Sequence, residues 1–271
     1  MIKLVETYPK EWMFVFSKEF EETLDDFYYA WDLYSSGQLK EAEKEFLEIL
    51  RIIPDHLDVL HYLAMLKERK GDKEGAFYLW EKAVELGKKA FPENFETGKD
   101  KIRWSILNNR PFLRCLHAYG LSLLEKDKKD EALSIFKELI LLNPKDNLGV
   151  RIIIVNLLFS FNQPEKVLKI CSSYPDDITP EILYGRPLAL FQIGRKKEAT
   201  KHLKKAITTL PLVAKELLKK KHKKPKIYPD RVTIGGKDEA YLYWLENKEF
   251  WEKTDGAIEW LKSIYDNFHS K

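Results

Sequence analysis

The stretch that decides the fold is residues 113–146, LRCLHAYGLSLLEKDKKDEALSIFKELILLNPKD. Gly120 lies in its first apolar segment, Ala132 and Phe136 lie in its second, and Pro144 follows that second segment. Paired helices approach closely only where side chains are small, and a large aromatic side chain fills the hole beside such a crossing. Proline then stops the helix that precedes it. The stretch therefore predicts two antiparallel helices joined by a short turn.

The same pattern recurs towards the N-terminus. A shift of 34 residues aligns Ala42 with Ala76 and Phe46 with Trp80. It also aligns Gly37 with Gly71. Self-similarity at a fixed period is the signature of a protein built from stacked repeats.

This pattern resembles the tetratricopeptide repeat (TPR), in which a small residue and a Tyr in the first helix precede an Ala, an aromatic residue and a Pro. The resemblance implies an all-α fold, an α-α superhelix (TPR solenoid) of about five helical hairpins with a C-terminal helical cap. The predicted segments are a lead-in at 1–21, repeats at 22–56, 57–90, 113–146, 147–179 and 180–213, an insertion at 91–112, a basic helix end and linker at 214–229, and an aromatic-rich cap at 230–271.

Two repeats and the insertion depart from this pattern. The fourth repeat has Val167 where the family has Ala, and Pro164 is placed to begin its second helix. The fifth has Pro187 inside its first helix, which predicts a kink. The insertion holds a short stretch of helical character, KIRWSILNN, at 101–109.

First helices line the concave face of TPR proteins, so the resemblance also implies a binding groove. The predicted groove residues are Phe27, Trp31, Tyr34, His61, Met65, Arg114, His117 and Arg151. TPR domains that clamp a C-terminal carboxylate use Lys and Asn at such positions, which argues against that kind of clamp here. For any single aromatic residue, packing between repeats is the more common role. Clustered Trp, Tyr and Arg side chains nevertheless dominate binding energy at interfaces.

The tail after Pro229 holds Trp244, Trp251 and Trp260, and helices are predicted to begin near Lys237 and Asp255. Its sequence AYLYWLENKEFWEKTDGAIEWL is similar to a tail on prokaryotic TPR proteins of unknown activity. A terminal repeat needs its outer apolar face covered, so we expect the tail to act as a cap. The alternative is that the tail folds into the groove and excludes a ligand.

A basic segment runs from Arg195 to Lys226 and carries thirteen Lys or Arg residues against two Glu. Such a patch attracts phosphate backbones or an anionic lipid surface. The alternative is a solvated face that complements the acidic N-terminal half, with self-association head to tail. The predicted polyanion patch comprises Lys197, Lys201, Lys204, Lys205, Lys219, Lys220, Lys221, Lys223 and Lys224.

The sequence lacks the common catalytic and metal-binding motifs. The histidines do not follow metal-binding spacings, and there is no nucleophile elbow, phosphate loop or kinase signature. Cys115 and Cys171 fit reduced thiols of a cytoplasmic protein, and no apolar run is long enough for a membrane span. The Lys and Glu bias is one that hyperthermophile proteins share. We therefore expect a non-enzymatic scaffold without cofactor or metal that binds a protein or peptide, with RNA or another polyanion as the alternative ligand.

Overall fold

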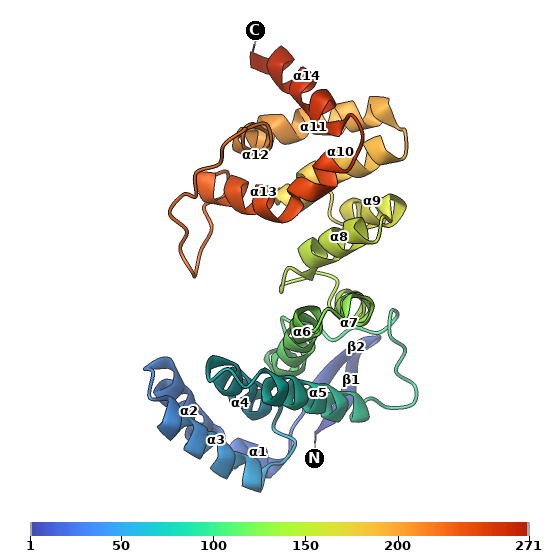
Figure 1. Cartoon of the computed structure of the whole chain (residues 1–271). Helices are drawn as coiled ribbons and strands as arrows, with labels where there is room; N and C mark the ends of the chain where they lie inside the picture. Colours follow the sequence, from blue (N-terminus) through green and yellow to red (C-terminus); the bar gives the residue numbers. More distant parts are fainter. Residues whose placement is uncertain (1, 270–271) are drawn as a thin grey trace. The chain divides into compact units, whose positions relative to one another are not determined.

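The computed structural model describes residues 2–269, with side chains to residue 267, and forms two compact units (Figure 1). Unit 1 is Met1–Val150 and unit 2 is Arg151–Lys271. The last two residues of the predicted cap, 270 and 271, lie outside the described residues. Consecutive helical hairpins make up both units, and they are followed by a C-terminal helical cap, which confirms the predicted fold class.

Unit 1 contains a two-stranded sheet, a short helix and three helical hairpins. Each hairpin of unit 1 joins its helices through a turn of a few residues. The elements are β1 (Lys3–Tyr8), β2 (Glu11–Val15), α1 (Lys18–Glu22), α2 (Leu24–Ser35), α3 (Leu39–Ile52), α4 (Leu57–Arg69), α5 (Lys73–Lys89), the 3-10 helix η1 (Leu107–Asn109), α6 (Arg110–Glu125) and α7 (Lys129–Leu142).

Small residues at the helix crossings hold these hairpins together. Ala42 and Phe46 are fully buried against α2. In the third hairpin, a Cβ added to Gly120 would lie 2.6 Å from the Phe136 ring, so only glycine allows this approach. At the turn of the first hairpin, Gly37 has a φ of 83°, a conformation that other residues adopt at a cost. The sequence repeats therefore reflect how closely the helices pack.

The β-sheet lies in the segment 1–21, which the sequence predicts only as a lead-in. β1 and β2 pair antiparallel around a turn in which Lys10 has a φ of 64°. Trp12 and Phe14 are buried while their neighbours Met13 and Val15 are more exposed, which is the two-residue period of a strand. The strands are too short for this alternation to stand out from the sequence.

The insertion at 91–112 ties this sheet to the third hairpin. The backbone N–H of Trp12 donates to the Lys101 carbonyl at 2.9 Å, and that of Ile102 donates to the Leu142 carbonyl at 2.9 Å. Buried Asn109 accepts from the Phe14 N–H at 3.0 Å and donates to the Trp12 carbonyl at 3.0 Å. Residues 101–106 are not helical, and α6 already begins at Arg110. The insertion therefore serves as a brace between elements far apart in sequence.

Unit 2 contains two helical hairpins, a linking helix and the tail. Pro164 begins the second helix of its first hairpin, and Pro187 lies inside the first helix of its second hairpin. The elements are α8 (Val150–Ser160), α9 (Pro164–Ser173), α10 (Pro180–Gln192), α11 (Lys196–Thr209), α12 (Pro211–Leu217), α13 (Lys237–Glu252) and α14 (Ala257–His269).

The tail covers α10 and α11. Trp251 is fully buried, and its indole N–H donates to the Tyr243 hydroxyl at 3.0 Å. The Trp260 ring stacks on Phe191 with centroids 4.5 Å apart, and its indole N–H donates to Thr200 Oγ1 at 3.2 Å. These contacts lie within unit 2 and are those of a cap.

Candidate functional site

A pocket of about 370 Å³ opens in unit 1 between the β-sheet, the first two helices and η1. We call it the aromatic pocket because most of its walls are aromatic or apolar. Its lining residues are Met13, Val15, Phe16, Phe20, Glu21, Leu24, Phe27, Tyr28, His56, Asp58, Leu107, Asn108 and Pro111.

One wall of the aromatic pocket is a row of four rings. Phe16 stacks on Phe20 with centroids 4.1 Å apart, and Phe20 stacks on His56 at 4.4 Å. His56 then stacks on Phe27 at 5.3 Å. Because each ring is held by its neighbours, this wall offers a preformed apolar surface that a bound side chain need not order.

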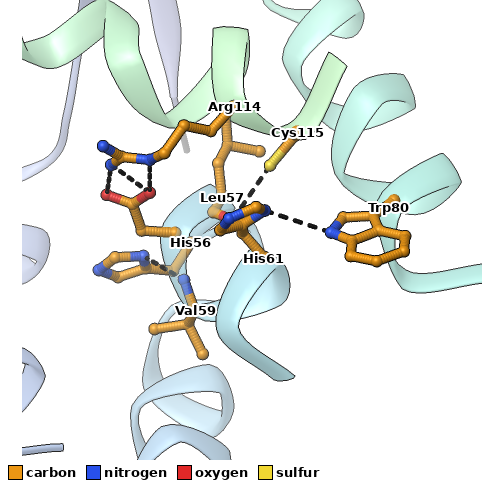
Figure 2. A network of polar contacts seen from close by, with 8 residues as sticks. His56, Leu57, Val59, His61, Trp80, Arg114 and Cys115 are labelled. Atoms are coloured by element: carbon orange, nitrogen blue, oxygen red, sulfur yellow. Dashed lines mark hydrogen bonds and ion pairs between the residues drawn. The ribbon is translucent and has the colours of Figure 1, made fainter. Parts of the chain in front are cut away.

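His56 contributes a neutral, buried ring to this wall. It precedes α4, and its Nδ1 accepts from the Val59 N–H at 3.3 Å (Figure 2). Burial lowers the pKa of His56 to about 4, so its ring is neutral at pH 7. Because Nδ1 accepts, the proton is assigned to Nε2, which is buried and has no hydrogen-bond partner among the described residues. Because this nitrogen is buried, the aromatic pocket offers a ligand an apolar wall and not this donor.

Asp58, beside His56, is a buried carboxylate with a built-in counterion. The Nη2 atom of Arg114 on α6 donates to both oxygens of this carboxylate, at 2.6 Å from Oδ1 and 2.7 Å from Oδ2. Burial raises the pKa of Asp58, and the Arg114 guanidinium opposes that rise. This charge is thus engaged within the protein, and it links α4 to α6.

His61 completes the network drawn in Figure 2. Its Nδ1 accepts from the Trp80 indole N–H at 3.2 Å, so α5 is tied to α4 (Figure 2). Burial, followed by the charges of Arg114 and His117, lowers the pKa of His61 to about 4. His117 itself contacts the Phe136 ring, with centroids 6.2 Å apart. These groups hold the hairpins in register. Among the described residues, no three His, Cys, Asp or Glu side chains gather into a group that could hold a metal ion.

The predicted groove residues of unit 1 thus divide between a surface and the core. Phe27 lines the aromatic pocket, and Trp31 is 39% exposed on the same helix. Tyr34 is only 7% exposed and lies under the Arg69 guanidinium, 4.3 Å from the ring centroid. Met65 packs against the core clusters of unit 1. Tyr34 and Met65 therefore present little surface to a ligand.

Arg151 belongs to unit 2 rather than to this set. It forms an ion pair with Asp177, and its guanidinium lies 5.4 Å from the Tyr174 ring centroid. The pKa of Asp177 is lowered despite burial, first by the hydrogen bond from the Thr179 backbone N–H and then by the pairing with Arg151. Two residues of the fourth repeat, Asp177 and Tyr174, thus contact Arg151.

Sequence reasoning missed Met13, Val15, Phe16 and Phe20, all of which line the aromatic pocket. They precede the repeats, so the 34-residue period gives no signal for them. The available signal was the apolar run at residues 12–16 and the two phenylalanines four residues apart, Phe16 and Phe20.

A second pocket, of about 540 Å³, lies in unit 2 at the basic segment. From the predicted polyanion patch it brings together Lys219, Lys223 and Lys224. Lys197, Lys201, Lys204 and Lys205 are carried by α11, away from this pocket. Lys220 and Lys221 are exposed and do not line it.

Two further observations bear on function. No helix among residues 2–269 is both long and apolar enough to cross a membrane. Both cysteines are free and buried, and burial raises the pKa of Cys171 to about 12. These thiols are consequently poor nucleophiles.

Solved structures with a similar fold are TPR proteins. The crystal structure of YrrB, described as a TPR protein with an unusual peptide-binding site, superposes with a TM-score of 0.50 at 15% identity and covers 72% of this chain and 93% of its own. The crystal structure of MamA gives a TM-score of 0.50 at 18% identity and covers 72% of this chain and 95% of its own. These likenesses support the TPR-like fold.

Family membership is given by the sequence rather than by the fold. No curated protein matches the chain. The model of the Tcf25 family, described as "Transcriptional repressor TCF25", matches residues 32–271. This corrects the assignment to a TPR family, and the comparisons do not support the likeness of the tail to prokaryotic TPR proteins. Since the match spans most of the chain and includes the tail, the protein belongs to the Tcf25 family.

Proposed function

We propose that the protein is a non-catalytic scaffold and that unit 1 binds a basic peptide by taking one of its apolar side chains into the aromatic pocket. The observation that carries this proposal is the preformed ring wall of Phe20, His56 and Phe27 in a pocket of about 370 Å³. Full burial of one large apolar side chain contributes about 1.5–3 kcal/mol. Such an anchor in a pocket is typical of binding hot spots.

The charge around the pocket favours a basic peptide. Residues 18–52, which form α1 to α3, carry ten acidic residues against four basic ones. Glu21 lines the pocket itself and is exposed. This negative charge would attract Lys or Arg residues beside the anchoring side chain. The main effect would be a higher association rate.

The comparisons agree with a binding role. YrrB, whose fold is similar, is described as having an unusual peptide-binding site. The family description names a transcriptional repressor, a function that an interaction scaffold can serve without chemistry of its own. We accordingly propose that the protein has no enzymatic activity.

Selection from a displayed library of short random peptides, followed by fluorescence anisotropy with the selected peptide, tests the proposal. Tyr28 and Tyr29 provide a matched pair, because they are 59% and 58% exposed on the same helix and only Tyr28 lines the pocket. We expect selected peptides to share a large apolar residue beside Lys or Arg. Tyr28→Ala should weaken binding about fivefold, equivalent to roughly 1 kcal/mol, and Tyr29→Ala should not.

Leu107→Arg extends this test to η1, which also lines the aromatic pocket. Leu107 is 67% exposed, so the substitution places a positive charge at the pocket without disturbing the core. It should weaken binding of a basic peptide by at least about tenfold. If all three variants bound the peptide as tightly as the wild type, the aromatic pocket would not be the binding site.

A further inference from the structure

Six lysines converge on the pocket of about 540 Å³ in unit 2, which we call the lysine pocket. It lies between α12, the loop that follows it and the first turn of α13. The lysines that line it are Lys215, Lys219, Lys223, Lys224, Lys226 and Lys237. Loop residues and helix residues thus supply positive charge to one concave site.

The loop is fastened to the helices that flank it. The His222 ring stacks on Trp244 of α13 with centroids 3.6 Å apart and an interplanar angle of 12°. Its Nδ1 lies 2.9 Å from Oε1 of Glu216 on α12. These contacts fix the position of the chain next to Lys223 and Lys224, so the lysines need not be gathered when a ligand arrives.

The positive charge of this pocket is largely uncompensated. Glu216 is the one carboxylate among its lining residues, and it is already paired with Lys219 and His222. Within the described part of the chain, no acidic group forms an ion pair with Lys215, Lys223, Lys224 or Lys237. Clustered like charges in a concave surface focus a positive potential and attract an anion.

The lining favours phosphate groups over nucleobases. No aromatic ring lines the pocket. The Trp244 ring is occupied by His222 and by the Lys248 ammonium, 4.7 Å from its centroid. The nearby Tyr228 ring is covered by Lys226 at 4.7 Å and Arg231 at 4.5 Å. Binding of single-stranded nucleic acid usually needs free rings for stacking, whereas Lys ammonium groups bind phosphate as point charges.

We propose that the lysine pocket binds an oligophosphate, a compact anion with several linked phosphate groups. The four ammonium groups without an acidic partner would meet phosphate oxygens, and the fixed loop would set the size of anion that fits. These groups belong to Lys215, Lys223, Lys224 and Lys237. This site is distinct from the aromatic pocket and belongs to unit 2 alone.

Isothermal titration calorimetry with inorganic tripolyphosphate and the full chain tests this proposal. The site variant is Lys223→Glu with Lys224→Glu, and the matched control is Lys220→Glu with Lys221→Glu, which changes the net charge equally outside the pocket. We expect one tripolyphosphate per chain, with affinity that falls as salt rises. The site variant should lose roughly tenfold or more in affinity, while the control stays within about threefold.

Orthophosphate and a single-stranded oligouridylate serve as competing ligands. We expect orthophosphate to bind far more weakly than tripolyphosphate, because it meets fewer lysines. Equal loss of affinity in both variants would overturn the pocket, since it would indicate diffuse attraction to the whole basic segment. Tight oligouridylate binding that tripolyphosphate does not displace would also overturn it, in favour of an extended RNA surface. Circular dichroism of both variants checks that they remain folded.

Discussion

Removal of the Arg114 guanidinium should lower the free energy of unfolding, because it leaves the buried Asp58 carboxylate without its counterion. In Arg114→Met, a carboxylate whose side chain is only 12% exposed loses the partner that grips both of its oxygens. Breaking a fully buried pair costs about 3–5 kcal/mol. Because the Arg114 side chain is itself 31% exposed, water screens part of the interaction, and we expect a loss of about 2–4 kcal/mol.

The pH dependence of this loss follows from the direction of the pKa shift. Burial already raises the pKa of Asp58, and without Arg114 nothing on α6 opposes that rise. A carboxyl whose pKa is higher in the folded protein destabilises the fold while it is ionised, and this cost disappears as pH falls through the folded pKa. Loss of Arg114 also eases protonation of His61, which acts in the same direction. The difference in free energy of unfolding between the wild type and Arg114→Met should therefore become smaller as the pH falls.

Urea unfolding followed by circular dichroism at neutral and mildly acidic pH measures this gap. Arg114→Met combined with Asp58→Asn should recover part of the loss, because the amide carries no charge to leave unpaired. Lys73→Met, which removes an exposed ion pair with Glu125, is the control and should unfold like the wild type. A neutral-pH loss below about 1 kcal/mol, or a gap that widens on acidification, would refute the reasoning.

Three further predictions concern stability. Gly87→Ala should lower the free energy of unfolding by about 1–3 kcal/mol in a urea titration, because its Cβ would lie 2.2 Å from the fully buried Phe112 ring. Trp251→Ala should cost about 3–5 kcal/mol by the same measurement, since the indole is fully buried in the cap. Acidification from pH 7.5 to pH 5 should cost about 2 kcal/mol for each of His56 and His61, because their folded pKa of about 4 lies below that of the unfolded chain and unfolding takes up protons.

The repeats were predictable because their signal is local and periodic. Ala42 and Phe46 recur 34 residues later as Ala76 and Trp80, and each is buried where its hairpin closes. Hairpin contacts join residues close in sequence, so the pattern of residue types directly reflects the packing. Prolines at the helix boundaries add a second local signal, as Pro164 does at the start of α9.

The aromatic pocket was predictable only in part, because it depends on contacts between distant segments. Phe27 could be named from its place on a first helix, whereas Phe16 and Phe20 lie outside the repeats. Asn109 bonds to two residues that lie 95 and 97 positions away in the sequence. No local sequence pattern predicts such a pairing. Tyr34 was predicted to line the groove but packs under Arg69. Helical spacing does not distinguish an aromatic residue that faces a groove from one that is buried.

A crystal structure of the full chain with the selected peptide tests the proposed binding role most directly. The account predicts that one apolar side chain of the peptide contacts the rings of Phe20 and His56. It also predicts basic residues of the peptide on the side of Glu21. A peptide that lies on another face, with the aromatic pocket unchanged, would contradict it.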